Sequence, residues 1–184
     1  MLMSGLMVCL VGALVVLLFI RTRTSGPTTV VIGTPAQPGQ SQEPVGPHTD
    51  PDTGILVMGI GDTVVSNGVL VGVTNVTQPA AGGAAESGSA LLQVDVEVHN
   101  AESAGGETFS VSGTNSFDLQ DGGGRSYAAL APSGGAKPPD GTLAPGATLD
   151  GSLLYEIQSG QTYRLLFKND RVSNGEIVID LGKW

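Results

Sequence analysis

The fold of this chain is decided by one stretch of strict alternation, Leu92-Gln93-Val94-Asp95-Val96-Glu97-Val98-His99. Every second residue is aliphatic, and the residues between them are polar or charged. Successive side chains of a β-strand point to opposite faces, so a period of two indicates one face in a core and the other toward water. We therefore predict a half-buried β-strand over residues 92–99.

Similar alternation recurs later and earlier in the chain. The aliphatic or aromatic residues that repeat at every second position are Val69, Val71 and Val73; Leu153, Tyr155 and Ile157; Tyr163, Leu165 and Phe167; and Ile177, Ile179 and Leu181. Shorter strand candidates cover 55–60 and 117–119. Between them lie turn-forming pairs such as Asn67-Gly68 and Asp121-Gly122, because glycine accepts the positive φ that hairpins need. No segment of this region carries a helical stripe, so the pattern predicts an all-β sandwich or barrel.

Two long connections separate these strands, at 78–89 and 131–142. The first is rich in Ala and Gly, a composition more typical of a mobile loop than of a binding loop.

The N-terminal residues 1–23 are predicted to form a membrane anchor. Residues 1–20 contain no charged side chain, and twenty helical residues rise about 30 Å, which matches the hydrocarbon core of a bilayer. Arg21 and Arg23 then end the run. We expect residues 2–20 to contact the membrane as a single transmembrane helix.

A cleaved signal peptide is the alternative for this segment, but its apolar part usually has about 7–15 residues. Met7 and Val8 precede Cys9, where a lipoprotein signal requires small residues, so Cys9 is interpreted as an apolar residue of the helix. Orientation is open to two readings. Arg21 and Arg23 alone favour a cytoplasmic C-terminal part, whereas the resemblance described below favours an extracellular one, which we predict.

The next segment, 24–53, is predicted to be a flexible linker. It holds six of the 11 prolines, namely Pro27, Pro35, Pro38, Pro44, Pro47 and Pro51. Such a composition buries too little apolar surface to offset the entropy of ordering. Residues 54–184 then form one domain of about 130 residues, long enough for a hydrophobic core.

Composition excludes several classes of function. The chain has 184 residues and a formal net charge of −9, which argues against nucleic-acid binding because that needs a basic surface. One Cys and two His are too few for a Cys/His zinc site.

We find no catalytic pattern in the predicted domain. A nucleophile needs a base within hydrogen-bond reach, and only His99 is available there, since His48 lies in the linker. Its place on the charged face of a strand is typical of a solvated residue. Ser133-Gly134-Gly135 lacks the strand and helix of a nucleophile elbow, and Gly59-Ile60-Gly61-Asp62 lacks the third glycine of a dinucleotide site.

Two clusters of acidic residues are candidate cation sites. Asp50-Pro51-Asp52-Thr53-Gly54 is a fragment of a calcium loop without the terminal bidentate ligand. Asp118 and Asp121, followed by three glycines, are a second candidate for weak cation binding, although a hairpin turn explains the same residues. We predict no catalytic, cofactor-binding or metal-binding residue and no cofactor.

Four segments together resemble a known family. They are the strand ending Val98-His99-Asn100, the hairpin Phe117-Asp118-Leu119-Gln120-Asp121 with Tyr127, the segment Leu143-Ala144-Pro145-Gly146, and the closing Ile177-Val178-Ile179-Asp180-Leu181. In this order they are similar to the bacterial domain of unknown function 4352 family. The resemblance covers nearly all of 54–184.

This resemblance implies an immunoglobulin-like antiparallel β-sandwich, related in shape to the mycobacterial immunoprotective extracellular antigens. The family usually follows a lipoprotein signal or a membrane anchor and a polar linker. It carries no established catalytic residues, so none transfer to this chain. The motif residues have structural interpretations: Pro145-Gly146 and Asp121-Gly122 form turns, and Asn100 caps a strand end.

The expected function is a non-catalytic, membrane-anchored extracellular module that binds a protein or cell-envelope component of unknown identity. An alternative is a structural or assembly subunit that pairs with itself or with a membrane partner. A large exposed apolar patch would favour the alternative.

Overall fold

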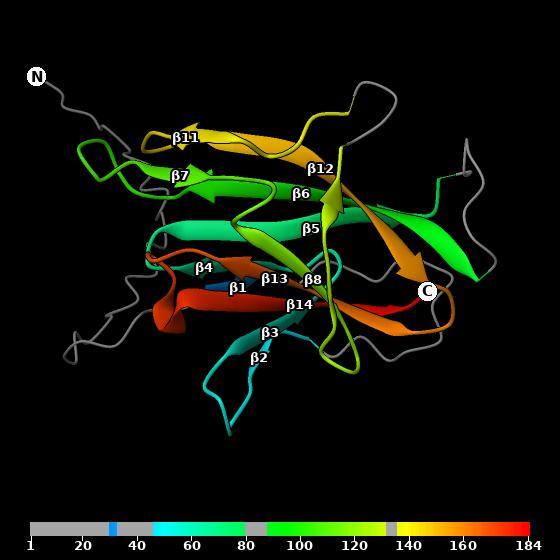
Figure 1. The fold of residues 1–184 in the computed structure, drawn as a ribbon. Helices are drawn as coiled ribbons and strands as arrows, with labels where there is room; N and C mark the ends of the chain where they lie inside the picture. The colour runs from blue at the N-terminus through cyan, green and yellow to red at the C-terminus, as the bar shows by residue number, and fades with distance from the viewer. Residues whose placement is uncertain (1–29, 33–45, 80–87, 132–135) are drawn as a thin grey trace, which may run out of the picture.

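The computed structural model describes residues 30–32, 46–79, 88–131 and 136–184, which form two β-sheets packed face to face (Figure 1). Within these ranges there is no α-helix, and the one helical element is a 3-10 turn at Ser173–Gly175 (η1). The all-β prediction is confirmed for this part of the chain.

The predicted transmembrane helix lies outside the described residues, as does most of the predicted linker. In the part of the chain that the structure describes, no helix has the length and apolar character needed to cross a membrane.

The first sheet has the strand order β1-β4-β5-β6-β12-β10, with every neighbouring pair antiparallel. The strand bounds are Val30–Ile32 (β1), Thr63–Ser66 (β4), Val69–Thr77 (β5), Ser89–Asn100 (β6), Thr148–Gln158 (β12) and Ala129–Leu130 (β10). The alternating stretch 92–99 therefore lies inside β6, which β5 and β12 flank on either side.

The second sheet has the order β2-β3-β14-β13-β8-β9. The strand bounds are His48–Thr49 (β2), Leu56–Gly59 (β3), Glu176–Lys183 (β14), Thr162–Lys168 (β13), Phe117–Asp121 (β8) and Ser126–Tyr127 (β9). Two further strands, Phe109–Val111 (β7) and Gly141–Leu143 (β11), pair with each other.

One pairing corrects the prediction of a purely antiparallel sandwich, because β3 runs parallel to β14. Leu56 pairs with Ile177 and Met58 with Ile179. The two strands come from opposite ends of the domain, so no hairpin between them imposes an antiparallel direction.

The core lies between the sheets and consists of the aliphatic face predicted from the sequence. In β6 the alternate residues Leu92, Val94, Val96 and Val98 are 0–2% exposed. The second sheet contributes the inward residues Phe117, Leu119, Tyr163, Leu165, Phe167, Ile177, Ile179 and Leu181. The period-two pattern thus identifies the buried faces of both sheets.

Two short strands lie inside the segment predicted to be a linker. β1 pairs with β4, Val31 facing Val64, and β2 pairs with β3, His48 facing Val57. The sheets therefore begin before residue 54, the boundary predicted from the proline content. The apolar island at 30–32 forms an edge strand because the β4 edge supplies a partner that the local sequence does not show.

The Asn67-Gly68 pair forms the predicted turn between β4 and β5. Both residues have positive φ, 48° and 78°, as a type I′ turn requires. This short turn holds β4 and β5 in register from Ser66 and Val69 onward.

Candidate functional site

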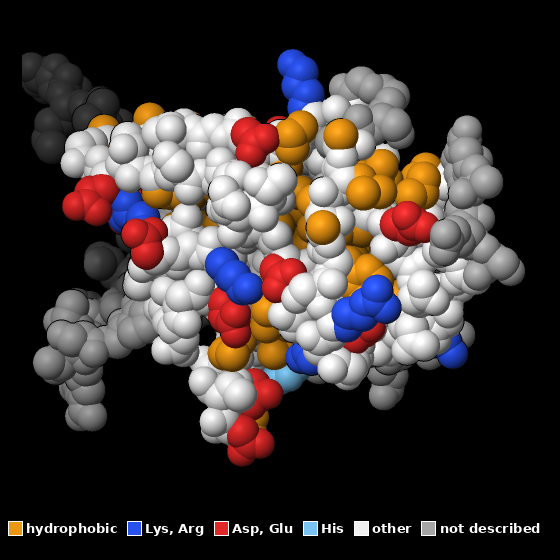
Figure 2. Space-filling view, viewed as in Figure 1, with side chains coloured by type: hydrophobic (Ala, Val, Ile, Leu, Met, Phe, Trp, Pro, Cys, Tyr) orange, Lys and Arg blue, Asp and Glu red, His pale blue; other side chains and the backbone are white. Residues whose placement is uncertain are grey.

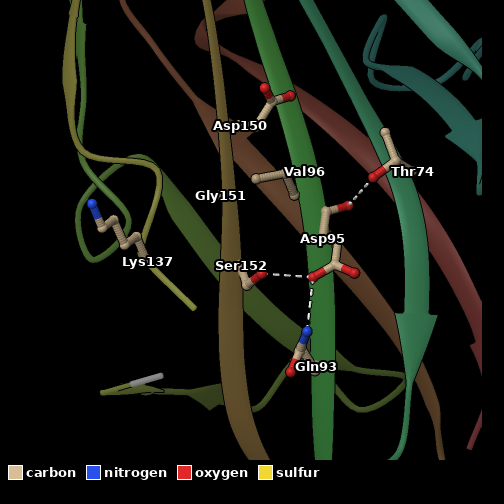
Figure 3. Close-up of a pocket in the computed structure, with 8 residues that line it drawn as sticks. All are labelled: Thr74, Gln93, Asp95, Val96, Lys137, Asp150, Gly151 and Ser152. Carbon is tan, nitrogen blue, oxygen red and sulfur yellow. Dashed lines mark hydrogen bonds between the residues drawn. The ribbon is translucent and has the colours of Figure 1, made fainter. Parts of the chain in front are cut away.

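An open, polar cleft of about 380 Å³ lies on the outer face of the first sheet (Figure 3). β5, β6 and β12 form its floor, and the segment that contains Lys137 forms one rim. The residues that line it are Thr74, Gln93, Asp95, Val96, Lys137, Asp150, Gly151 and Ser152.

A β-bulge in β5 gives this cleft its shape. The register between β5 and β6 shifts between Val73 and Asn75, so Asn75 pairs with Asp95 and Thr74 is the extra residue. The Thr74 hydroxyl donates a hydrogen bond to the Asp95 carbonyl at 3.2 Å. Bulges of this kind redirect side chains, and here the bulge brings the Asn75 amide to the Asp95 carboxylate.

Asp95 is the centre of the cleft because three strands donate hydrogen bonds to its carboxylate. Ser152 Oγ donates to Oδ1 at 2.7 Å and Gln93 Nε2 to the same atom at 2.9 Å. Asn75 Nδ2 donates to Oδ2 at 3.1 Å. The carboxylate is thereby fixed in one orientation within the sheet.

Two opposing effects determine the pKa of Asp95. Partial burial raises the pKa, but the hydrogen bonds from Ser152, Gln93 and Asn75 together outweigh burial and leave the pKa below its ordinary value of 3.8. Asp95 is therefore ionised at neutral pH and forms a fixed negative centre in the cleft.

We expect Ser152→Ala to lower the free energy of unfolding by about 1 kcal/mol at pH 7, since the shortest bond to the carboxylate is lost. Because folding lowers the pKa of Asp95, the ionised form stabilises the fold above pH 3.8, and this contribution is lost as the pH falls through the folded-state value. Denaturant unfolding of both proteins from pH 7 downward should show the difference disappearing in acid.

Ser110→Ala is the matched control, because the Ser110 hydroxyl in β7 bonds the neutral Thr142 hydroxyl, at 3.1 Å, and not a carboxylate among the described residues. Its effect should be smaller and independent of pH over the same range. A Ser152→Ala loss that persists unchanged at the acid end would contradict the assignment of this bond to the ionised carboxylate.

The row next to Asp95 holds a like-charge pair. Glu97 in β6 pairs directly with Asp150 in β12, and Gly72 of β5 completes the row. Carboxylates directly opposite each other repel, so this pair adds to the negative potential of the cleft. Lys137 lies on the opposite side of β12 from Thr74 (Figure 3).

Among the described residues that line the cleft, no histidine lies beside the Ser152 hydroxyl. The Ser152 hydroxyl donates to the Asp95 carboxylate instead. His99 is half-buried on the same sheet and bonds Thr148 Oγ1 at 2.9 Å. His48 lies in β2 of the other sheet, where it contacts the Gly46 carbonyl at 3.2 Å.

The three tyrosines of the domain do not line the cleft. Tyr127 and Tyr163 form an edge-to-face pair at 5.5 Å, on strands of the second sheet. Tyr155 is fully buried on the inner face of β12, and its hydroxyl has no hydrogen-bond partner among the described residues. Burial first, and then the charge of Asp118, raise the pKa of Tyr155.

Asp118 and Asp121, the candidate cation ligands, serve different contacts. Asp118 forms an ion pair with Lys168 at 3.2 Å. Asp121 accepts the Gly123 and Arg125 backbone N–H groups at 2.9 and 3.0 Å and the Tyr127 hydroxyl at 3.0 Å.

The backbone bond from Arg125 is the largest cause that lowers the pKa of Asp121. Asp121 therefore organises the β8–β9 hairpin. The turn interpretation holds for this residue.

The calcium-loop fragment is also a turn. Asp50 Oδ1 accepts the N–H groups of Asp52 and Thr53 at 2.9 and 3.1 Å, an Asx-type turn. Asp62 likewise accepts the Gly59 N–H at 3.0 Å. Within the described ranges, no three His, Cys, Asp or Glu side chains are placed to hold a metal ion. Ser133-Gly134-Gly135 lies outside those ranges.

Sequence reasoning noticed the polar face of β6 but missed the cleft. Thr74, Asn75, Lys137 and Ser152 were not singled out, because each looks like an ordinary polar residue in its own segment. The available signal was the polar residue at position 152, one place before the alternating Leu153. Its meaning depends on the β6–β12 register, which places it opposite Asp95.

The comparisons with known proteins agree with this fold. The family model described as "Domain of unknown function (DUF4352)" matches residues 58–177. No curated protein matches the chain.

Three solved structures are similar. The yjhA protein from Bacillus subtilis has 22% identity and a TM-score of 0.51 over 67% of this chain and 98% of its own. The ycdA protein from the same organism, a candidate lipoprotein, has 18% identity and a TM-score of 0.52 over 63% of this chain and 37% of its own.

MPT63, a secreted protein from Mycobacterium tuberculosis, has 13% identity and a TM-score of 0.41 over 74% of this chain and 89% of its own. At these identities the similarity concerns the β-sandwich fold alone.

Proposed function

This chain belongs to the DUF4352 family, and we propose that it is a membrane-anchored extracellular module that binds a protein or cell-envelope component without catalysis. The observation that carries the proposal is the cleft on β5, β6 and β12. Its central carboxylate is fixed by three hydrogen bonds on a rigid sheet, which is the preorganised polar surface that recognition needs. The negative cleft favours a partner that presents donors or cationic groups.

The anchor rests on the apolar run at residues 2–20, which has the length of a membrane span. The ycdA protein, which shares the fold, is described as a candidate lipoprotein, and this supports a place at the cell envelope. Arg21 and Arg23 would then lie on the outer side of the membrane, with the domain extracellular.

An immunoglobulin-like arrangement is part of the proposal. Tyr163 lies near the start of β13, and its hydroxyl accepts the Gln158 N–H at 2.9 Å and donates to the Gln158 carbonyl at 2.7 Å. Immunoglobulin-like sandwiches use such a tyrosine corner between two strands. The loops at the ends of this fold are common binding sites, which fits a binding module.

The side of the membrane on which the domain lies tests this proposal. A specific protease site inserted between Gln40 and Ser41, with a C-terminal tag, should yield a tagged fragment when the protease is added to intact cells. The insertion lies between β1 and β2, so it leaves the cleft untouched. A cytoplasmic marker that stays uncut is the control. Cleavage only after lysis would mean that Arg21 and Arg23 keep the domain inside, and the proposal would be wrong.

The assembly alternative was expected to show a large exposed apolar patch. Of the large hydrophobic side chains in the described residues, only Leu130 is exposed, at 41%. The described surface therefore offers no large apolar patch in support of self-association. A pattern of charges on the other sheet supports it instead.

A further inference from the structure

The outer face of the second sheet carries a regular pattern of charge on its two central strands. Leu165, Phe167, Ile177 and Ile179 point into the core, so the residues between them point outward. On β13 these outward residues are Arg164, Leu166 and Lys168, and on β14 they are Asp180, Val178 and Glu176. Figure 2 shows this face, with orange side chains between blue and red ones.

The register between β13 and β14 places these outward residues directly opposite one another. Arg164 pairs with Asp180, Leu166 with Val178, and Lys168 with Glu176. One strand therefore has a positive group at each end of this block, and its neighbour has a negative group at each end. Both have an aliphatic residue at the centre.

We propose that a second copy of this chain docks on this face through a two-fold axis that runs along the strands between β13 and β14. Such an axis places β13 of one protomer over β14 of the other. Arg164 then faces the partner's Asp180, and Lys168 faces the partner's Glu176. Packed sheets lie about 10 Å apart and cross at about 30°, which long side chains of this kind can span.

The same charge pattern disfavours a two-fold axis that runs across the strands. An axis across the strands would place Arg164 over the partner's Lys168 and Asp180 over the partner's Glu176. Both contacts join like charges, which suppresses this arrangement. The charges thus select one two-fold geometry out of two, as an isologous interface requires.

A hollow provides room for the docked side chain. Beside Asp180 the face is hollowed by about 260 Å³, with Val57, Val178 and the protomer's own Arg164 among its lining residues. The partner's Arg164 stands over this hollow, where its aliphatic stem contacts the two valines and its guanidinium reaches Asp180. Arg164 is exposed, and no ion pair joins it to Asp180 within the protomer.

The apolar centre is small, because Leu166 and Val178 are only 6% and 9% exposed. The proposed dimer contact is therefore weak, and the charges set its orientation. Lys168 already forms an ion pair with Asp118 of its own protomer, so in the dimer it must divide its charge between Asp118 and the partner's Glu176. Confinement of two anchored chains to one membrane raises their effective concentration. The inference deepens the assembly alternative and rests on it, but it requires neither the anchor nor the cleft.

Charge reversal tests the face. The full chain is measured by sedimentation equilibrium in detergent at low and high ionic strength, with wild type, Arg164→Asp, Asp180→Arg and the double variant. Wild type should dimerise more strongly at low ionic strength. Each single reversal creates two repulsive contacts and should weaken dimerisation at least tenfold. The double variant restores both attractions and should dimerise like wild type.

Mixing the two single variants gives the decisive test of this interface. An equimolar mixture of the Arg164→Asp and Asp180→Arg proteins pairs opposite charges at both contacts, so two proteins that are monomeric alone should form a heterodimer. Loss of folding cannot produce this result. Thermal unfolding of each variant is measured in parallel, and Arg164→Gln with Asp180→Asn replaces any reversal that does not fold.

Dimerisation that all variants retain, or a mixture that stays monomeric, would overturn the proposal. The topology experiment is separate, so a cytoplasmic domain that still shows the charge-dependent dimer would contradict only the proposed location.

Discussion

Replacing Asn100 by alanine is expected to lower the free energy of unfolding by about 3 kcal/mol, one of the largest effects of any single polar substitution in this domain. Asn100 ends β6 and is 0% exposed. Its Nδ2 donates to the Glu107 carbonyl at 2.9 Å and to the Leu143 carbonyl at 3.0 Å, and its Oδ1 accepts the Glu102 N–H at 3.2 Å. Removing the amide breaks all three bonds, at about 1 kcal/mol each, although the Glu107 carbonyl keeps its contact with Arg171 Nη1.

The loss should extend beyond these three bonds, because the segment 101–107 is held from two sides. Arg171 Nη2 contacts Glu102 Oε1 at 2.9 Å, and its Nη1 donates to the Glu107 carbonyl at 3.1 Å. When the Asn100 amide is absent, the segment is held by Arg171 and by the bond from the Ala101 N–H to the Gly68 carbonyl at 2.7 Å.

Thermal unfolding monitored by circular dichroism measures the effect, with an expected fall in Tm of roughly 10 °C for a domain of this size. Asn115→Ala is the control: Asn115 is exposed, and its expected change is within about 0.5 kcal/mol. A loss below about 1 kcal/mol for Asn100→Ala would show that other donors replace the amide.

Asn100 also illustrates what sequence reasoning achieves. Its role as a cap at a strand end was proposed from the resemblance, and the structure confirms that its side chain bonds backbone beyond the strand. The partners Glu107 and Leu143 lie 7 and 43 residues away. Such distances follow from tertiary packing, so the residue could be identified but its partners could not.

The strands also differ in how far the sequence predicts them. Long strands with strict alternation, such as β6 and β13, are predictable because burial of one face acts on every second residue. The strands β9 and β10 have only two residues each, too few for any period to appear. They form because a longer neighbour offers an edge, as β12 does for β10.

The candidate site lies mostly beyond the reach of the sequence. Asn75, Asp95 and Ser152 meet across separations of 20 and 57 residues, and the contact from β5 depends on a bulge at Thr74. Composition shows only that one face of β6 is polar. The register of three strands decides which polar residues become neighbours, and a single bulge changes it.

The hairpin at Asp121 was predicted in part from the sequence. The Asp-Gly turn was predicted from local chemistry, and the resemblance placed Tyr127 in the same motif. The structure supplies the physical link, a hydrogen bond of 3.0 Å from the Tyr127 hydroxyl to Asp121 Oδ2. Arg125 lies over the same ring at 5.2 Å. The spacing in the motif is therefore set by a turn that brings its own two polar ends together.

Replacing Gly151 by alanine is expected to cost about 2–3 kcal/mol, because the space for a Cβ is already occupied. Gly151 lies in the middle of β12, and Pro139 crosses directly over it. An added Cβ would lie 2.6 Å from Pro139 Cα and 2.8 Å from Pro139 Cβ, and it would also meet Pro139 N. Real Cβ atoms essentially never come within 3.0 Å of a heavy atom outside their own residue and its chain neighbours, so the proline segment must move.

Movement is costly because hydrogen bonds fix this segment at both ends. The Ser152 N–H donates to the Lys137 carbonyl at 2.8 Å, and Asp140 Oδ1 accepts the Gly113 N–H at 2.8 Å. Displacing Pro139 therefore strains both bonds and shifts Lys137, which forms the rim of the cleft. A single methyl group on β12 thus links the stability of the sandwich to the shape of its candidate binding surface.

Gly141→Ala is the matched control for this substitution. Its Cβ would lie 3.5 and 3.6 Å from the two methyl groups of Leu149, an ordinary van der Waals distance, so the expected change is within about 0.5 kcal/mol. Denaturant unfolding of the two variants gives the comparison, and NMR shift changes at Lys137 report the rim. If Gly151→Ala proved as stable as Gly141→Ala, Pro139 could not be seated on β12. The rim of the cleft would then lack the support that this geometry gives it.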